Sequence, residues 1–240
     1  MRGVFVTGTG TGVGKSVVAA ALAAALVACG ERVVAAKPLL SGLDADAPAW
    51  PPDHELLARV TGNPADEIAP HRYGPPVSPH LAARWAGERH EVAVLASGVA
   101  ARYEAARTAA ARAADGVPPV LIAEGAGGLL VPINDDGATM ADLAAALGLP
   151  LLIAAHPGLG TINHVMLTLD AARRRSLEVS AVVLTPWPQQ PGAIERDNLA
   201  HLAARAAVPI LRLAEVERPD PALLADAGRA AGLPALVSVR

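Results

Sequence analysis

The chain has 240 residues, of which 52% are hydrophobic and 18% are charged, and its formal net charge is −3. This length and hydrophobic content are sufficient for the core of one large α/β domain but marginal for two. The sequence contains no block of basic residues, so it lacks the electrostatic signature of a nucleic-acid-binding protein. Because no shift in composition marks a boundary, we expect a single domain over residues 1–240.

The sequence also argues against secretion and membrane insertion. The single cysteine, Cys29, cannot form an internal disulfide, a pattern typical of the reducing cytoplasm. The long apolar stretch after Lys15 ends at Cys29-Gly30, and we expect it to be a buried helix rather than a membrane span. A signal peptide is not expected, because a glycine-rich loop already begins at residue 8. We therefore expect a cytoplasmic protein without a membrane partner.

Short apolar segments alternate with helical segments along the chain. Strands are predicted at residues 4–6, 32–36, 119–123, 150–155, 179–184 and 209–213. Helices are predicted at residues 17–27, 53–60, 79–85 (capped by Ser78), 91–114 (interruptible at Gly98), 139–147, 161–175, 194–206 and 221–231. Residues 39–52 and 64–80 are predicted as loops up to the Ser78 cap, and an apolar tail covers residues 236–239. This alternation is typical of βαβ units, with a mainly parallel sheet covered by helices on both faces.

Residues 8–16 form a glycine-rich loop between the first predicted strand and the first predicted helix. Their sequence is Gly8-Thr9-Gly10-Thr11-Gly12-Val13-Gly14-Lys15-Ser16. A glycine-rich loop between a strand and a helix is typical of a phosphate-binding P-loop, whose backbone N–H groups and helix N-terminus attract anionic oxygens. Lys15 would supply a cation for the β- and γ-phosphates, and the Ser16 hydroxyl is a ligand for Mg²⁺. The alternating glycines disfavour the alternative of a turn without a ligand. We therefore predict a three-layer α/β fold of the P-loop NTPase type.

Lysine occurs at two positions only, Lys15 and Lys37, and the remaining 18 of the 20 basic residues are arginine. A compact ammonium differs from a planar guanidinium in reach and geometry, so these two positions indicate chemistry that needs lysine. Lys37 follows a predicted strand, and ligands of such sheets bind at the C-terminal ends of strands. A second cation there would stabilise a transferring phosphoryl group. The alternative is a solvated surface lysine.

Glu124 follows another apolar strand and precedes Gly125-Ala126-Gly127-Gly128. A carboxylate at this strand end can ligate the Mg²⁺ held by Ser16, and the glycines allow the backbone to approach a ligand closely. The alternative is a solvated loop acid. Asp53 is a weaker candidate, because a helix N-cap explains it equally well. The seven histidines show no metal-ligand spacing, so we expect them to be structural or at the surface. These residues indicate a Mg²⁺-nucleotide enzyme or switch without specifying a substrate.

The chain resembles the dethiobiotin synthetase family. The resemblance is carried by residues 8–16, Lys37-Pro38-Leu39-Leu40-Ser41-Gly42, Ser78-Pro79-His80, residues 124–128 and Leu159-Gly160-Thr161-Ile162-Asn163-His164, which occur in the family's order. The stretched P-loop, in which Gly8 lies one residue earlier than usual, is itself a trait of this family. The resemblance implies a homodimeric enzyme that converts 7,8-diaminononanoate, CO₂ and ATP to dethiobiotin, ADP and phosphate.

The resemblance also implies roles for individual residues. Catalytic roles fall to Lys15, Lys37 and Thr11, and Mg²⁺ ligation to Ser16, Asp53 and Glu124. Nucleotide binding falls to Gly12, Val13, Gly14, Lys15, Ser16, Val17, Asp53, Glu124, Gly125, Ala126, Gly127, Thr185 and Pro186. Ser41 would contact the carbamate end of the substrate, whereas Gly160, Thr161 and Asn163 would receive its carboxylate tail across the dimer interface.

The sequence departs from the family pattern at Thr185, where dethiobiotin synthetases usually have an asparagine that reads adenine. A hydroxyl cannot reproduce the paired donor and acceptor of an amide, so other nucleoside triphosphates become candidates beside ATP. The loop that lines the base in the family is not clearly present around residues 212–217, and we assign no role there.

Two other functions are alternatives for a P-loop of this kind. The first is an ATPase switch of the chromosome-partitioning type, which acts by nucleotide-dependent dimerisation and has an extra lysine where this chain has Gly10. The second is the ATP-dependent amidation domain of corrin-ring synthesis, whose chains are usually much longer and include a glutaminase domain. The switch leaves Lys37-Pro38 and residues 159–164 unexplained. For the amidation domain, nothing in this sequence could supply a glutaminase.

Overall fold

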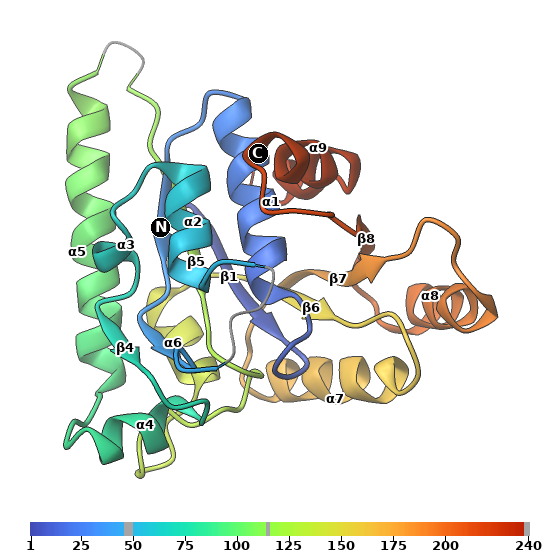
Figure 1. Cartoon of the computed structure of the whole chain (residues 1–240), viewed down its shortest axis with the longest axis horizontal. Helices are drawn as coiled ribbons and strands as arrows, with labels where there is room; N and C mark the ends of the chain where they lie inside the picture. Colours follow the sequence, from blue (N-terminus) through green and yellow to red (C-terminus); the bar gives the residue numbers. More distant parts are fainter. Residues whose placement is uncertain (46–49, 114–115, 238–240) are drawn as a thin grey trace.

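The computed structural model describes residues 1–45, 50–113 and 116–237. Its centre is a parallel sheet of six strands in the order β2-β5-β1-β6-β7-β8 (Figure 1). The strands are β1 (Gly3–Gly8), β2 (Val33–Ala36), β5 (Val120–Glu124), β6 (Leu151–Ala155), β7 (Val179–Trp187) and β8 (Ile210–Ala214). All six correspond to strands predicted from the sequence, and the α/β fold class is confirmed.

The register of the sheet aligns the C-terminal ends of its central strands. Val6 of β1 lies opposite Glu124 of β5, and Ala36 of β2 lies opposite Ala123. The glycine-rich loop, Lys37 and Glu124 therefore leave the sheet at one edge. This is the edge at which parallel α/β sheets bind ligands.

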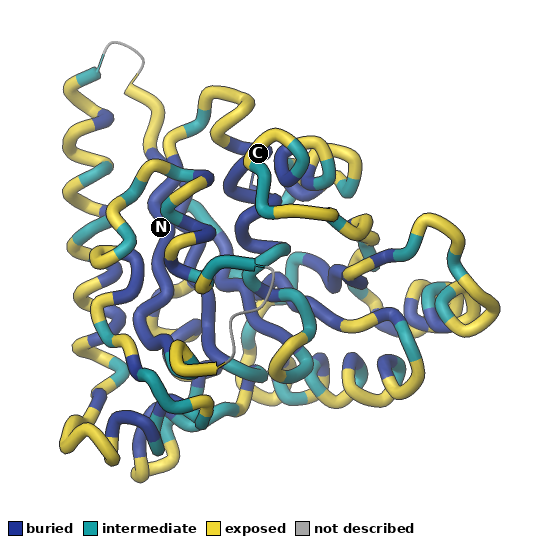
Figure 2. The backbone as a smooth tube through the Cα atoms, viewed as in Figure 1, coloured by how far each residue is buried: buried dark blue, intermediate teal, exposed yellow. Residues whose placement is uncertain are grey.

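Helices cover both faces of the sheet (Figures 1 and 2). One face carries α1 (Lys15–Ala28), α2 (Asp53–Thr61) and α9 (Pro221–Ala230). The other carries α5 (Val92–Ala111), α6 (Met140–Leu147), α7 (Thr161–Arg174) and α8 (Ala193–Arg205). No helix in the described ranges combines the length and the apolarity needed to cross a membrane.

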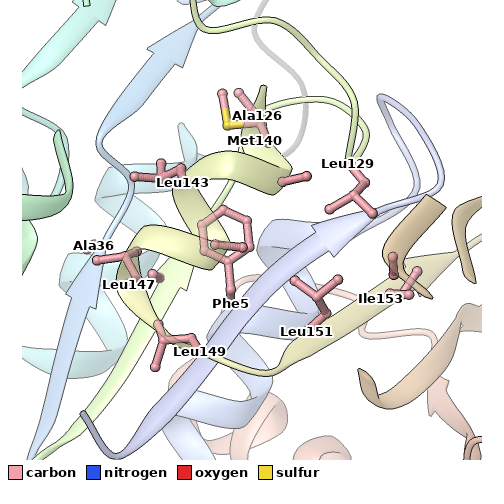
Figure 3. Packing of buried hydrophobic residues seen from close by; sticks show 14 of the residues in the cluster. Phe5, Ala36, Ala126, Leu129, Met140, Leu143, Leu147, Leu149, Leu151 and Ile153 are labelled. Atoms are coloured by element: carbon pink, nitrogen blue, oxygen red, sulfur yellow. The ribbon is translucent and has the colours of Figure 1, made fainter. Parts of the chain in front are cut away.

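Strand β1 shows how the two cores are separated. Phe5 points into the core on the α6 side, where Figure 3 shows it among Leu143, Leu147 and Met140. Val4 and Val6 point into the opposite core with α1. Because successive strand residues face opposite sides, a strand buried on both faces reads as a continuous apolar run.

Helix α1 is buried on nearly every side between the sheet and the helices α2 and α9. Its residues Val18–Leu26 are no more than 4% exposed, which is typical of a helix that is apolar all round. Its contact with α9 is very close, because a Cβ added to Gly228 would lie 2.3 Å from the carbonyl oxygen of Ala21. The glycine therefore sets the distance between the two helices.

A smaller unit lies beside β2 and was not predicted. Strands β3 (Leu39–Ser41) and β4 (His71–Tyr73) pair in parallel, and α3 (Ala65–Ile68) precedes β4. Helix α4 (Pro79–Trp85) follows, with Ser78 at its N-cap as expected, although the Ser78 side chain makes no capping hydrogen bond. The prediction of residues 39–52 and 64–80 as loops is wrong where β3, α3 and β4 form. Strands of three residues are too short to show a period, and their pairing joins segments far apart in the chain.

Several element boundaries also differ from the prediction. Helix α5 continues through Gly98 without a break, and β7 continues to Trp187 through a cis Thr185-Pro186 peptide. The expected end of helix α5 at residue 114 lies outside the described residues, as do residues 238–239 of the apolar tail. The chain before them forms a short 3₁₀ helix, η1 (Leu233–Leu236).

The substitution Gly228→Ala tests the packing of α9 on α1. In an open helix interior this change stabilises a protein by roughly 0.5–1 kcal/mol. Here the new methyl group would overlap the Ala21 carbonyl and force the helices apart. We expect the free energy of unfolding to fall by about 1–3 kcal/mol, as measured by urea denaturation.

Gly98→Ala provides the matched control, because Gly98 lies exposed on α5 and an added Cβ meets no atom within 4 Å. The free energy of unfolding should rise by up to about 1 kcal/mol. Equal effects of the two substitutions would contradict the close approach of α9 to α1.

Candidate nucleotide and substrate site

The P-loop connects β1 to α1 in a conformation that requires glycine. Gly12 and Gly14 have φ angles of +76° and +84°, in the left-handed region that other residues rarely adopt. Gly14 is also the N-cap of α1. The Lys15 side chain reaches back over the loop, where its Nζ donates to the Gly10 carbonyl at 3.0 Å. The loop thus surrounds a helix N-terminus and one ammonium group.

Lys37 lies between two carboxylates beside this loop. Its Nζ is 2.6 Å from Glu124 Oε1 and 2.5 Å from Asp53 Oδ2. The Ser16 hydroxyl donates to the same Glu124 oxygen at 2.7 Å. The four side chains come from α1, the end of β2, the start of α2 and the end of β5. The sequence therefore predicted a group of residues that the fold does bring together.

Asp53 does not cap helix α2, which is the alternative to metal ligation that its sequence position suggests. Pro52, not Asp53, is the N-cap of α2, and Asp53 is the first helical residue. Its carboxylate makes the ion pair with Lys37 instead of a capping hydrogen bond. The N-cap interpretation of Asp53 is therefore wrong. The interpretation of Lys37 as a solvated lysine is wrong as well, because it is only 2% exposed.

Burial and charge act against each other in this cluster. Burial disfavours the charge on Lys37, but Glu124 and Asp53 outweigh it, and the pKa of the Lys37 ammonium is raised. For Asp53, burial is outweighed by Lys37 and Ser16, which hold the pKa of the carboxyl below its usual value. Burial, with the repulsion of Asp53, raises the pKa of Glu124. Burial also lowers the pKa of Lys15. The result is a fixed cation at Lys37 under neutral conditions.

The oxygen atoms of this cluster fit a magnesium ion. Glu124 Oε2 is buried and, among the residues described, has no hydrogen-bond partner. The Ser16 hydroxyl and the Asp53 carboxylate are near the same side chain. Hydroxyl and carboxylate oxygens are the hard ligands that Mg²⁺ prefers, usually with several waters retained. An unpaired buried carboxylate oxygen is costly, and a bound cation would satisfy it.

A cavity of about 700 Å³ opens beside the cluster. It is bounded by the P-loop, Lys37, the segment after β3, the start of α2, the residues before α4 and the turn after β5. Among the predicted site residues it includes Thr11, Gly12, Gly14, Lys15, Ser16, Val17, Lys37, Ser41, Asp53, Ala126 and Gly127. Its volume is within the range of small-molecule sites.

Part of the cavity wall was not predicted from the sequence. Trp50 and Pro51 line one side, and Pro76–Pro79 line another. Ser41 holds the second of these segments against β3, because its hydroxyl donates to the Val77 carbonyl at 2.6 Å. No role is predicted for these residues, although Ser78-Pro79 belongs to a block that carries the family resemblance, because the wall depends on the pairing of β3 with β4.

Other predicted site residues lie away from this cavity. Thr185 is 2% exposed and packs under the P-loop, where its Cγ2 would be 2.8 Å from a Cβ added to Gly14. Gly160, Thr161 and Asn163 form the start of α7, beyond the end of β6. The Thr161 hydroxyl is buried and has no hydrogen-bond partner among the described residues, whereas Asn163 is exposed. Within one chain, the α7 start does not line the cavity.

Comparisons with known proteins identify the family of the chain. A family model described as an AAA domain matches residues 2–221. An ATP-dependent dethiobiotin synthetase of Anaeromyxobacter dehalogenans is 46% identical over 186 residues, which cover 77% of this chain and 76% of the relative. Another, of Saccharopolyspora erythraea, is 41% identical over 233 residues, covering 96% and 95% of the two chains. The chain belongs to the dethiobiotin synthetase family. The resemblance found in its sequence blocks is thus confirmed.

Dethiobiotin synthetases are ligases, so the chain is an enzyme of this class and uses a nucleotide. Among solved structures, the MinC:MinD cell division complex of Aquifex aeolicus matches with a TM-score of 0.56 at 12% identity, covering 96% of this chain and 95% of that chain. At this identity the likeness concerns the fold alone. This structural match therefore does not support a partitioning-type switch as the function of the chain.

Lys37→Met tests the buried charge cluster of this dethiobiotin synthetase family member. We expect the free energy of unfolding at pH 7 to fall by roughly 3–5 kcal/mol, as when one partner of a buried ion pair is removed. Without the ammonium, the pKa values of Asp53 and Glu124 would rise above those of the unfolded chain. Protonation then favours the folded variant, so its deficit should shrink as the pH falls from 7 towards about 4. Urea denaturation at several pH values measures this change.

Arg174→Met is the control for removing an exposed cation. Arg174 pairs with Asp170 at 2.7 Å, but both side chains are more than half exposed. Such a pair contributes about 0–1 kcal/mol. If the loss in Lys37→Met were equally small, or independent of pH, the buried cluster would not be held by charge as described.

Proposed function

We propose that this chain catalyses the ATP-dependent carboxylation and ring closure of 7,8-diaminononanoate to dethiobiotin, with release of ADP and phosphate. The observation that carries the proposal is the buried Lys37, fixed by Glu124 and Asp53 in the same cavity as the P-loop. A nucleotide-binding site alone needs only one such cation. A second, immobile one suits a reaction in which a small acceptor becomes anionic next to the transferred phosphoryl group.

The reaction would proceed through three bond-forming steps. One substrate amine adds to CO₂ and loses a proton, giving a carbamate. A carbamate oxygen then takes the γ-phosphoryl group of ATP, giving a carbamic-phosphoric mixed anhydride and ADP. The second amine attacks the carbonyl carbon, the ring closes and phosphate leaves. Each intermediate carries anionic oxygens, and holding both amines near the activated carbon makes the last step intramolecular.

The residues of the cavity divide these tasks. Lys15 and the P-loop backbone would bind the triphosphate, and Lys37 would lie next to the carbamate oxygens. Thr11 and Ser41 would orient the carbamate end of the substrate. Ser16, Asp53 and Glu124 would hold Mg²⁺, which neutralises phosphate charge when bound. Gly125, Ala126 and Gly127 would let the chain approach the nucleotide closely, and Val13 and Val17 flank the phosphate-binding residues.

The carboxylate tail of the substrate would be bound by a second copy of the chain. Gly160 is the N-cap of α7, and the first turn of a helix offers free N–H groups to an anion. The buried Thr161 hydroxyl has no partner among the described residues, and Leu159 beside it is 93% exposed. Asn163 is exposed on the same turn. These features support a homodimer in which Gly160, Thr161 and Asn163 complete the partner's site.

Nucleotide selectivity is expected to be broad. Thr185 and Pro186 lie where the family usually reads the base, but the Thr185 side chain packs on Gly14. It has no amide with which to read adenine. We therefore propose that other nucleoside triphosphates can replace ATP. We also propose that residues 1–240 form a single cytoplasmic domain that needs neither nucleic acid nor a membrane.

The function is tested by supplying its substrates. Purified protein with Mg²⁺, ATP, bicarbonate and 7,8-diaminononanoate should yield dethiobiotin, detected by mass spectrometry, with an equimolar amount of ADP. Release of ADP at the same rate without the diamine would contradict the ligase function and favour a simple ATPase. The same assay with other nucleoside triphosphates reports the base preference.

Lys37→Arg tests the need for an ammonium at this position. The guanidinium keeps the charge but cannot occupy the same space between Glu124 and Asp53. We expect kcat/KM to fall by at least about tenfold. Arg102→Lys is the control, because the Arg102 side chain donates a hydrogen bond to the Ala35 carbonyl outside the cavity. This variant should keep full activity. Retained activity in a correctly folded Lys37→Arg variant would remove the assigned role of Lys37.

A further inference from the structure

A second group of ligand-type side chains lies in the small β3–β4 unit, outside the cavity described above. His71 belongs to β4, whereas Glu88 and His90 lie in the connection between α4 and α5. One ligand atom from each of the three residues lies within 4.8 Å of the others. The spacing of the histidines along the chain does not indicate this group. The sequence predicts histidines that are structural or at the surface, and the fold adds a group of two of them with a carboxylate that could hold a metal ion.

The three side chains are held at short distances by their surroundings. The rings of His71 and His90 have centroids 4.4 Å apart and are tilted by 54°. His90 Nε2 is 3.8 Å from Glu88 Oε2. The Tyr73 hydroxyl lies between these two groups, at 2.5 Å from each, and donates to the Glu88 oxygen. The cluster is thus already compact.

Its backbone is anchored from two sides. Strand β4 pairs with β3, and this pairing fixes His71. The Asn134 amide donates to the His90 carbonyl at 3.1 Å, which fixes the other half of the cluster. His90 is 6% exposed, whereas Glu88 is at the surface. An ion could therefore enter past Glu88 without opening the core.

One of the three ligand separations is close to that in a small transition-metal site, and the other two are within 4.8 Å. With Zn²⁺ bonds of about 2.0–2.1 Å to nitrogen and oxygen, tetrahedral ligand atoms lie about 3.4 Å apart. The separation of 3.8 Å between His90 Nε2 and Glu88 Oε2 is only a few tenths of an ångström larger. Two imidazoles and one carboxylate form a donor set that suits zinc and disfavours Mg²⁺, which prefers oxygen ligands alone.

We propose that His71, Glu88 and His90 form a Zn²⁺ site separate from the nucleotide site. Ligation by His90 Nε2 would replace its hydrogen bond to Tyr73 and leave its proton on Nδ1. The fourth position would be taken by water or by the Tyr73 oxygen. Each imidazole would bind in its neutral form, so the affinity should decrease when the histidines are protonated.

Such an ion would connect β4 to the segment that leads into α5. Strand β3, which pairs with β4, carries Ser41 at the cavity wall, and Ser41 is bonded to Val77. The ion would thus reinforce the wall that faces the substrate without touching it. Its role would be structural, because it lies apart from Lys37 and the P-loop.

The experiment uses the full chain, freed of metal by dialysis against a chelator. An excess of Mg²⁺, about 10 mM, is then added to block the nucleotide site. The oxygen ligands there prefer Zn²⁺ over Mg²⁺ less strongly than imidazoles do, so Mg²⁺ competes for that site and not for the histidines. Isothermal titration calorimetry with Zn²⁺ should show one equivalent bound. Thermal unfolding of the loaded protein should show a higher midpoint than that of the metal-free protein. Co²⁺ in place of Zn²⁺ should give visible absorption bands of a low-coordinate site with nitrogen ligands.

Variants distinguish this site from other places where zinc could bind. Glu88→Gln and His71→Gln, which change exposed or partly exposed ligands, should each weaken Zn²⁺ binding by at least about tenfold. His201→Gln, at an exposed position on α8, is the control and should bind as the unaltered chain does. Both ligand variants should keep ligase activity with Mg²⁺, because neither residue lines the cavity.

Three results would overturn the proposal. The first is the absence of Zn²⁺ binding by the unaltered chain. The second is binding that survives in the double variant His71→Gln/Glu88→Gln. The third is a Co²⁺ spectrum that does not change in the ligand variants. Because none of these depends on dethiobiotin formation, failure of the zinc site and failure of the proposed function remain distinguishable.

Discussion

The contacts of Lys37 with Glu124 and Asp53 are the interaction on which the C-terminal edge of the sheet depends. They join the end of β2, the end of β5 and the start of α2, which are far apart in the chain. The register of the parallel sheet places Lys37 beside Glu124. The burial of these groups would be costly without their mutual attraction, so the fold and the charge arrangement require each other.

The same arrangement prepares the site for chemistry on anions. Lys15, Lys37 and the N-terminus of α1 line one cavity. The Asp53 and Glu124 carboxylates lie beside Lys37, and Glu124 Oε2 has no hydrogen-bond partner among the described residues. These charges are fixed before any substrate arrives. Preorganised charge of this kind stabilises developing negative charge without the cost of reorienting water. The proposed cyclo-ligase reaction uses this property at each of its stages.

The β3–β4 unit shapes the other side of the cavity. Its pairing brings Ser41 and residues 76–79 to the substrate wall, and it also assembles His71, Glu88 and His90 at a distance from that wall. One small structural unit therefore serves two purposes in our proposals. It forms part of the substrate pocket and offers a separate point at which a metal ion could stabilise that pocket.

The sequence by itself determined the P-loop and the six main strands, and it singled out Lys15, Lys37 and Glu124, because these depend on local patterns. Apolar runs, glycine spacing and the scarcity of lysine are visible without a fold. Only the tertiary structure decided the β3–β4 pairing, the ion pair of Asp53, the packing of Thr185 on Gly14 and the histidine cluster. Each of these joins residues that are distant in the chain, and such contacts leave no periodicity in the sequence. Their positions follow from strand register and helix packing, which are set by the burial of the whole core.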